Sequence, residues 1–174
     1  MGIHTLASAL EREHRQINEG IGSFTSGSHA GDALPLSSAI QALRRHIFLE
    51  EEFLFPPLRD GAPGLSTTVL LMLREHGQLW DVLDQLEREI ITDRNGKATL
   101  ALCDRLVAVL SPHHLKEEQS LYAAADHLLT RPAEVRLRGF LSYARLPEGW
   151  SCEKAKNRDS RSRAALRSLY QRSC

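Results

Sequence analysis

The sequence is short of cysteine and of long apolar runs, and each shortage excludes a class of protein. Its three cysteines, Cys103, Cys152 and Cys174, are widely spaced and form no Cys-x-x-Cys pair, which fits a reducing cytosol better than a disulfide framework. No stretch approaches the roughly 20 apolar residues of a membrane span. The first residues lack the basic and then apolar pattern of a secretion signal. We therefore expect a cytoplasmic protein with no membrane partner.

Net charge is also lacking, since 22 basic residues balance 22 acidic ones. The overall charge therefore gives no reason to expect nucleic acid or an acidic substrate as a partner. With 174 residues the chain suits one domain with a proper core and an appendage. We expect the domain over residues 1–130 and a C-terminal helical, basic extension over 131–174. The segment from Ser151 is rich in Arg, Lys and Ser, a composition that could contact RNA, lipid headgroups or an acidic partner but more often is solvated or loosely packed.

What the chain does have is apolar residues at spacings of three and four, the pattern of amphipathic helices. This pattern predicts four long helices over about residues 3–21, 34–55, 66–91 and 98–129, and shorter ones over 133–143 and 163–170. Long helices with short connections favour an all-α fold, an antiparallel up-down-up-down four-helix bundle with a short C-terminal helical extension.

Several residues predict where these helices begin, end or bend. Pro56 and Pro57 should end the second helix. Ser66 should cap the start of the third, and Gly96 should close it in a left-handed conformation. Pro112 should kink the fourth helix or force a local bulge just before the following histidine.

One polar pattern occurs twice inside the apolar stripes. The segments His46–Pro56 and His113–Tyr122 each contain His-x-x-x-Glu, then a second acid and a Leu-aromatic pair. Positions four apart are neighbours on one helix face, with roughly 5–6 Å between Cβ atoms. An imidazole nitrogen and a carboxylate oxygen at that spacing can bind the same transition-metal ion. In the second segment His113 falls nearer the middle of the buried face than His114, so we prefer the pair that begins at His113 and ends at Glu117.

Counting residues from each predicted turn places four histidines at one level of the bundle, within about a turn at a rise of about 1.5 Å per residue. Two glutamates lie one turn further along their helices. A single histidine on an apolar face is usually a satisfied core residue, but each polar group buried without a partner costs roughly 2–7 kcal/mol. A metal centre is the simplest common partner for the whole set, which consists of His14, His46, Glu50, His76, His113 and Glu117.

The ligand types also narrow the choice of metal. Imidazole and carboxylate without thiolate suit iron, zinc, manganese or copper. Two carboxylates that can bridge, with two histidines for each end, suit two metal ions better than one. Iron is the first choice, and the spacing itself leaves manganese and zinc open.

The motifs resemble the hemerythrin-like (His-His-Glu cation-binding) domain family over about residues 3–129. The resemblance rests on Glu13-His14, His46-x-x-x-Glu50-Glu51-x-x-Leu54-Phe55-Pro56, Glu75-His76 and His113-x-x-x-Glu117-Glu118-x-x-Leu121-Tyr122. It implies a four-helix bundle that holds a non-haem di-iron centre with an oxo or hydroxo bridge. Carried over by position, the first two histidines would bind one iron, the last two the other, and the two glutamates would bridge them.

The chain departs from the oxygen carriers of that family at one position. Those proteins have a further histidine four residues after the position of His76, and this chain has Trp80 there. A metal with fewer protein ligands keeps water-filled positions, which favours reaction with peroxide, nitric oxide or oxygen over reversible oxygen carriage. The alternative is that Trp80 packs over the site and only shields it.

Three hypotheses follow. The leading one is a di-iron protein, monomer or homodimer, that binds or reduces peroxide, nitric oxide or oxygen, with catalase-like, peroxidase-like or nitric-oxide-reducing activity. The second is an iron or oxygen sensor, or an iron-storage protein without turnover, and the third is a structural bundle with no metal. Candidate pocket walls are Phe48, Phe53 and Trp80, and candidates for proton delivery are His114 and Glu118.

Overall fold

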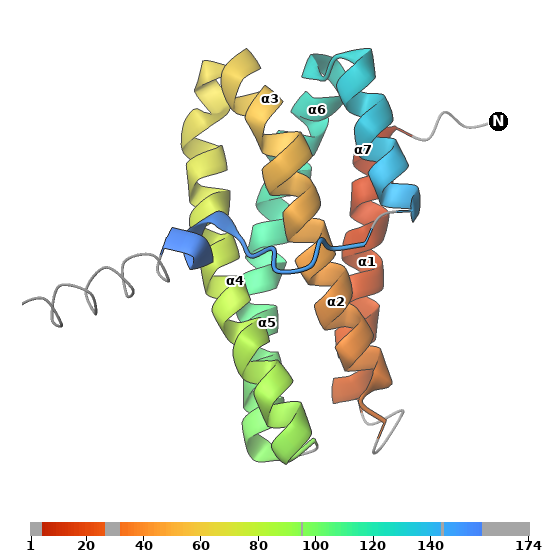
Figure 1. Ribbon diagram of the computed structural model, residues 1–174, viewed down its shortest axis with the longest axis vertical. Helices are drawn as coiled ribbons and strands as arrows, with labels where there is room; N and C mark the ends of the chain where they lie inside the picture. Colours follow the sequence, from red (N-terminus) through yellow and green to blue (C-terminus); the bar gives the residue numbers. More distant parts are fainter. Residues whose placement is uncertain (1–4, 27–31, 95, 144, 158–174) are drawn as a thin grey trace, which may run out of the picture.

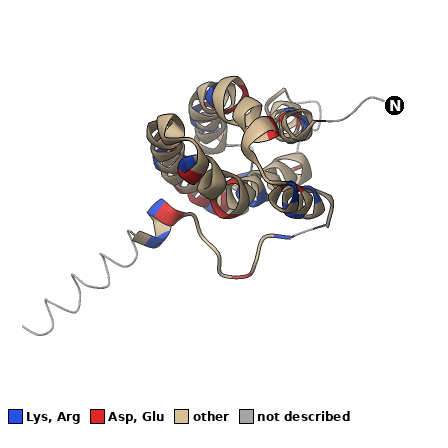
Figure 2. Ribbon diagram, turned by 90° about the horizontal axis from the view of Figure 1, so that it is seen from above, with Lys and Arg blue, Asp and Glu red and all other residues tan. Residues whose placement is uncertain are grey.

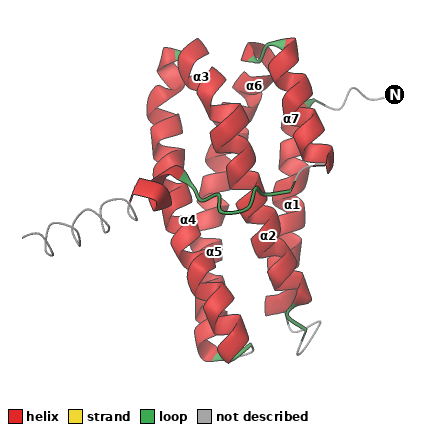
Figure 3. Cartoon of the chain, in the orientation of Figure 1, coloured by secondary structure: helices red, strands yellow, loops and turns green. Residues whose placement is uncertain are grey.

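The computed structural model describes residues 5–26, 32–94, 96–143 and 145–157. Four long helical rods run antiparallel side by side (Figure 1), and the described residues are helical apart from short loops (Figure 3), which confirms the predicted fold class. The predicted helix 163–170 and the first residues of the predicted first helix lie outside the described residues. The rods are α1 (Leu6–Thr25); α2 (Leu34–Leu49), η1 (Glu50–Leu54) and α3 (Phe55–Gly61); η2 (Pro63–Leu65) and α4 (Ser66–Thr92); and α5 (Lys97–Lys116), η3 (Glu117–Tyr122) and α6 (Ala123–Leu128), followed by α7 (Arg131–Tyr143).

The second rod continues past the two prolines that were expected to end it. After α2 the chain makes one π-helical turn, η1, in which the N–H of Phe55 bonds to the carbonyl of Glu50, five residues back. A new α-helical segment, α3, starts at Phe55 and runs to Gly61. Pro56 and Pro57 therefore lie in the first turn of a helix, where a missing N–H removes no essential bond.

The fourth rod is also irregular, at a different residue from the one predicted. Pro112 lies inside α5, which continues unbroken to Lys116. Of the two predicted alternatives, the bulge just before His113 is therefore wrong, and the kink at Pro112 stays a prediction. The π-helical segment η3 begins four residues after that histidine, at Glu117. Both π-helical segments of the chain's described part thus begin at a glutamate of the predicted site. Such wide turns shift the angular position of the residues after them and are frequent at functional sites.

Two predicted helix caps are wrong. Ser66 begins α4, but Leu65 holds the N-cap position, and the Ser66 hydroxyl donates instead to the carbonyl oxygen of Arg59 at 3.5 Å. Gly96 has a φ of −68° and caps the start of α5, so it needs no left-handed conformation. A Cβ at Gly96 would overlap the carboxylate of Asp93, so that side chain would have to move.

The apolar core consists of two clusters with a polar layer between them. In α1, for example, Leu10 belongs to one cluster and Ile17 to the other, and His14 lies between them in the sequence. The same holds for the other three rods, where the intervening histidines are His46, His76 and His113. The rings of His14 and His46 are 4.7 Å apart and those of His76 and His113 are 5.0 Å apart, so the predicted single layer of histidines is present.

Beyond α7, residues 145–157 cross the outside of the bundle; we call this segment the strap (Figures 1 and 2). The Trp150 ring packs edge-on against rings of α2 and α4, and its Nε1 donates to Glu52 at 2.8 Å. Cys152 is fully buried. At Gly77 of α4 the strap comes so close that an added Cβ would lie 2.7 Å from the Cβ of Lys154. The start of the basic extension is therefore packed on the bundle, where loose packing was expected.

Candidate metal centre

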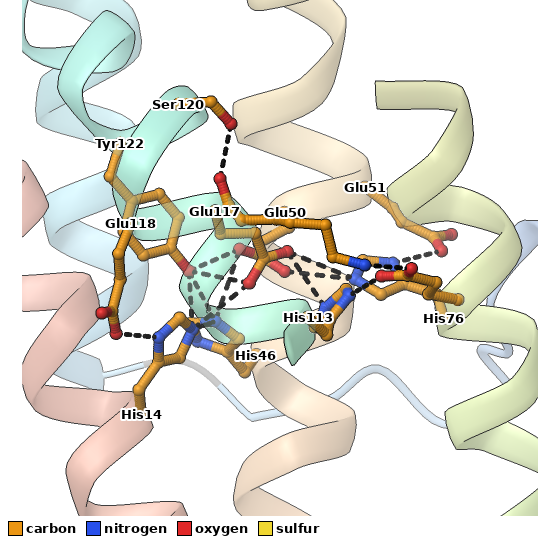
Figure 4. A network of polar contacts seen from close by, with 12 residues as sticks. His14, His46, Glu50, Glu51, His76, His113, Glu117, Glu118, Ser120 and Tyr122 are labelled. Atoms are coloured by element: carbon orange, nitrogen blue, oxygen red, sulfur yellow. Dashed lines mark hydrogen bonds and ion pairs between the residues drawn. The ribbon is translucent and has the colours of Figure 1, made fainter. Parts of the chain in front are cut away.

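All six predicted site residues meet in the polar layer (Figure 4). Each is at most 1% exposed. They come from every rod of the bundle, which explains why the fold is needed to assemble them: His14 from α1, His46 and Glu50 from α2 and η1, His76 from α4, and His113 and Glu117 from α5 and η3.

The six residues form two overlapping groups of four. Half A consists of His14, His46, Glu50 and Glu117, and half B consists of Glu50, His76, His113 and Glu117. Within each half, one ligand atom from every residue lies within 4.8 Å of all the others. Both glutamates belong to both halves.

Each shared glutamate directs one oxygen to each half. Glu50 has Oε1 at 3.4 Å from Nε2 of His46 in half A and Oε2 at 3.3 Å from Nε2 of His76 in half B. Glu117 has Oε2 at 3.4 Å from Nε2 of His14 and Oε1 at 3.1 Å from Nε2 of His113. This is the arrangement that carboxylates bridging two cations require.

The other ring nitrogen of every histidine is held by a second carboxylate. The Nδ1 atoms lie 2.8–2.9 Å from carboxylate oxygens, so each Nδ1–H donates outward and Nε2 is left to face the centre. The pairs form a closed ring around the bundle, in which each helix holds the histidine of the next: Glu13 with His46, Glu51 with His76, Glu75 with His113, and Glu118 with His14.

Three of these supporting carboxylates are themselves anchored. Arg45 pairs with Glu13, and Lys116 pairs with Glu75. The backbone N–H of Glu153, in the strap, donates to Oε2 of Glu51 at 2.8 Å. Carboxylates that orient a histidine in this way fix its tautomer and raise its basicity as a ligand, so the chain's own hydrogen bonds prearrange the four imidazoles.

The ionisation of the site favours positive charge at its centre. Burial opposes the charged form of His113, but the charges and hydrogen bonds of Glu117 and Glu75 outweigh it and raise the pKa to about 9. Burial likewise opposes ionisation of Glu50, yet His46 and His76 hold its pKa well below the usual range. A site that stabilises both protonated imidazole and ionised carboxylate also attracts a metal cation.

Half B contains buried polar atoms that make no hydrogen bond within the described part of the chain. They are Oε2 of Glu50, Nε2 of His76 and Oε1 of Glu117. Because an unsatisfied buried polar group is costly, three of them directed at one place indicate a missing partner. A cation bound by imidazole and carboxylate satisfies all three at once, so these residues fit a metal ion.

Two aromatic residues of the site were not singled out from the sequence. The hydroxyl of Tyr122 donates to Oε1 of Glu50 at 2.7 Å and lies 2.8 Å from Nε2 of His14 (Figure 4). Burial and then the charges of Glu117 and Glu50 raise the pKa of this phenol well above its ordinary value. In half B, Phe55 stacks on His76 with ring centroids 5.4 Å apart. The pattern that could have revealed both is the Leu-aromatic pair that ends each repeat.

The structure gives His114 and Glu118, the two candidates for proton delivery, different surroundings from those that role requires. His114 is only 4% exposed and stacks on His14 at 3.5 Å, and neither of its ring nitrogens has a hydrogen-bond partner among the described residues. Burial and then the neighbouring imidazoles lower its pKa far below the usual range. Its burial, its stacking and the lack of a hydrogen-bond partner disfavour proton delivery by this ring, and Glu118 supports His14 instead.

The three aromatic residues expected to wall the site lie under the strap and α7. Trp80 packs against the guanidinium of Arg44 and the ring of Trp150. Phe48 contacts Phe53, and both contact a ring of α7. The aromatic side chain that directly contacts a ligand histidine of half B is Phe55, which stacks on His76.

Comparison with known proteins agrees with this geometry. The sequence model of one protein family, the hemerythrin HHE cation-binding domain, matches residues 5–125. Neither the curated proteins nor the solved structures contain a significant match to this chain. Among the described residues, no helix combines the length and the apolar character needed to cross a bilayer. With its helical bundle, its paired His/Glu groups and a match over most of its length, the chain belongs to the hemerythrin HHE cation-binding domain family.

Proposed function

We propose that this chain is a non-haem di-iron protein whose centre binds and reduces a small oxidant or diatomic molecule, namely peroxide, nitric oxide or oxygen. The observation that carries the proposal is the sharing of two buried carboxylates between two His/Glu groups. In this proposal the metal ligands are His14, His46, Glu50, His76, His113 and Glu117.

Iron fits the donor set better than the alternatives. The ligand atoms are imidazole nitrogens and carboxylate oxygens, and both cysteines in the described part of the chain, Cys103 and Cys152, lie outside the two groups. Such a set suits iron, with manganese or zinc ranked behind it. A bound di-iron centre supplies electrons and Lewis acidity to a small molecule.

The residues around the centre support a small molecule as the substrate. Full burial of the six ligands excludes bulk water and large substrates, so only a small molecule can react there. Trp80 occupies the position where the oxygen carriers have a further histidine ligand. Its ring packs against Trp150 of the strap. Half B therefore has two histidines and two shared carboxylates, which leaves room for an external molecule on its metal.

The first experiment measures metal content and the ultraviolet–visible spectrum of protein purified aerobically, beside a His46→Ala/His113→Ala double variant. We expect two irons per chain with near-ultraviolet oxo-bridge bands, both lost in the double variant. His127→Ala, which alters an exposed histidine of α6, is the matched control and should keep them. Peroxide and nitric oxide consumption by the iron form then tests turnover. Zinc or no metal, unchanged by the double variant, would overturn the proposal.

A sensor or storage role is the second candidate, and the strap favours it. Glu51 holds His76 through one oxygen and the backbone of Glu153 through the other, so occupancy of the centre would be coupled to the position of the strap. Under this alternative, iron-loaded protein would show no peroxide or nitric oxide turnover, and metal removal would accelerate protease cleavage of the strap. Turnover with metal-independent cleavage would exclude it.

A further inference from the structure

The hydroxyl of Tyr122 lies among the ligand atoms of half A (Figure 4). The residue is fully buried. Its Oη is within hydrogen-bond distance of all four members of that half: 2.8 Å from His14 Nε2, 3.0 Å from His46 Nε2, 2.7 Å from Glu50 Oε1 and 3.5 Å from Glu117 Oε2. A role as a packing residue of the core requires none of these contacts.

Hydrogen bonding alone does not account for this position. A phenol has one proton and so donates to one acceptor at a time. Here its oxygen faces two carboxylate oxygens and two imidazole nitrogens. The Nδ1 atoms of both histidines already face carboxylates, so their Nε2 lone pairs are directed at the same region as the phenol oxygen. Several lone pairs that converge in a buried place call for a cation.

The spacing of the atoms agrees with a common metal ion. Two ligands at right angles on a metal, with bonds of about 2.1 Å, are separated by about 3.0 Å. In half A the two Nε2 atoms are 2.9 Å apart, and each lies 3.4 Å from the glutamate oxygen beside it, Glu117 Oε2 for His14 and Glu50 Oε1 for His46. The phenol oxygen, at 2.7–3.5 Å from every one of them, has the spacing of a fifth ligand.

We infer that Tyr122 is a fifth protein ligand to the metal of half A and binds it through its phenolate oxygen. The inference rests on the proposed function for the presence of the metal. As the oxygen–metal bond forms, the phenolic proton leaves to solvent, so ligation needs no oxidant or reductant. Phenolate is a hard anionic oxygen donor and suits ferric iron.

The first repeat has a phenylalanine, Phe55, at the position that corresponds to Tyr122 in the second repeat. Tyr122 follows Glu117 by five residues, and Phe55 follows Glu50 by five residues, each across a π-helical turn. Phe55 has no oxygen to offer and stacks on His76 in half B. The two metals would therefore differ, with five protein ligands in half A and four in half B. This places the external small molecule on the metal of half B.

The test is the electronic and resonance Raman spectrum of the iron-loaded protein, with iron per chain measured on the same samples. We expect visible phenolate-to-iron charge transfer and phenolate ring modes in the wild type. Both should be lost in Tyr122→Phe, while at least the iron of half B remains bound. Tyr143→Phe makes the same chemical change on α7 and should leave the spectrum intact.

The outcomes separate this inference from the function it rests on. Two irons per chain without phenolate modes, or modes that survive Tyr122→Phe, would overturn the tyrosine ligand and leave the di-iron proposal standing. If the wild type holds no iron, the di-iron proposal fails, and the ultraviolet difference spectrum on adding zinc decides the inference. A tyrosinate signal that depends on Tyr122 would support it, and no signal would overturn it.

Discussion

The two His-x-x-x-Glu repeats that contribute to the centre share a backbone design and differ in the side chains around it. In both repeats a histidine precedes a shared glutamate by four residues, a π-helical turn begins at that glutamate, and the next residue is a supporting acid. The repeats diverge where Phe55 corresponds to Tyr122 and where Ile47 corresponds to His114. The comparison teaches that the repeated pattern sets where the ligands lie, whereas the unrepeated positions set what each half can do.

The largest effect should come from a residue that serves both halves. Glu117→Ala removes one oxygen from each half, so we expect loss of both metals. His76→Ala touches half B alone and should cost one metal. Metal content per chain, measured after purification under identical conditions, checks both. If Glu117→Ala kept one metal and His76→Ala lost both, the sharing of carboxylates would be wrong.

Removal of a supporting charge should give a smaller effect, confined to one half. Glu51→Gln weakens the hold on His76 in half B, and Glu118→Gln weakens the hold on His14 in half A. Supporting residues of this kind are typically worth 10–100-fold in metal affinity or activity, so we expect about that loss for one metal and little change for the other. Competition with a chromogenic chelator measures it. Equal weakening of both metals by either variant would contradict two separable halves.

Stability and metal affinity should depend on pH in both halves, because His46 of half A and His76 and His113 of half B all have raised pKa values in the metal-free chain. For His76 burial opposes the shift, and the neighbouring carboxylates of Glu50 and Glu51 outweigh it; for His113 the pKa reaches about 9. A raised folded-state pKa stabilises the protein fully below the unfolded value of 6.5 and loses that contribution as pH rises towards about 9.

The metal-free protein should therefore lose stability between pH 6.5 and about 9. Metal binding displaces the same protons, so metal affinity should increase over this interval. Thermal unfolding of metal-free and iron-loaded protein across the range should show the gap between their melting temperatures widening with pH. In His113→Gln the difference between the two melting temperatures should increase less with pH. A difference that decreases with pH would show that the pKa values of these histidines are not raised.

The smallest effect is expected from a substitution beneath the strap, which is connected to half B through Glu51. Gly77→Ala would push a methyl group against the Cβ of Lys154 and loosen the segment that bonds to Glu51. We expect a destabilisation of about 1–3 kcal/mol at most, as for other overpacked contacts, with faster proteolysis of the strap. Gly139→Ala on α7 meets nothing within 4 Å and is the control. Unchanged proteolysis of Gly77→Ala would show that the strap does not need this close approach.

Much of the fold and of the candidate site was predictable because it follows from periodicity. Apolar spacing predicts the four rods, and the levels of His14, His46, His76 and His113 follow from counting a constant rise per residue. The π-helical turns were not predictable in this way, because each begins at a glutamate that also faces a histidine of another rod, His76 for Glu50 and His14 for Glu117, and apolar spacing carries no information on such contacts. Pro56 and Pro57 misled for the same reason: a wide turn before them places them at a helix start.

The supporting carboxylates show a second limit. Glu13 and Glu75 each precede a site histidine in the sequence, which suggests that an acid acts on its own neighbour. In the structure each one acts on a histidine of another helix. Partners more than 30 positions apart in the chain cannot be assigned without the crossing geometry of the bundle. The burial of His114 and its stacking on His14 were not predicted, because both depend on that same geometry.

The closed ring of carboxylate–histidine pairs has a consequence for how this protein can change. Each helix carries an acid that acts on the following helix, and the last acts on the first, so the ring has a direction. A circular permutation that keeps the cyclic order of the helices preserves every pair, whereas exchange of two helices breaks several pairs even if the apolar core still fits. Among relatives, an acid should therefore vary together with the histidine of the next helix and not with the histidine beside it in the sequence. The ring records the order of the helices in the bundle as well as the position of the metals.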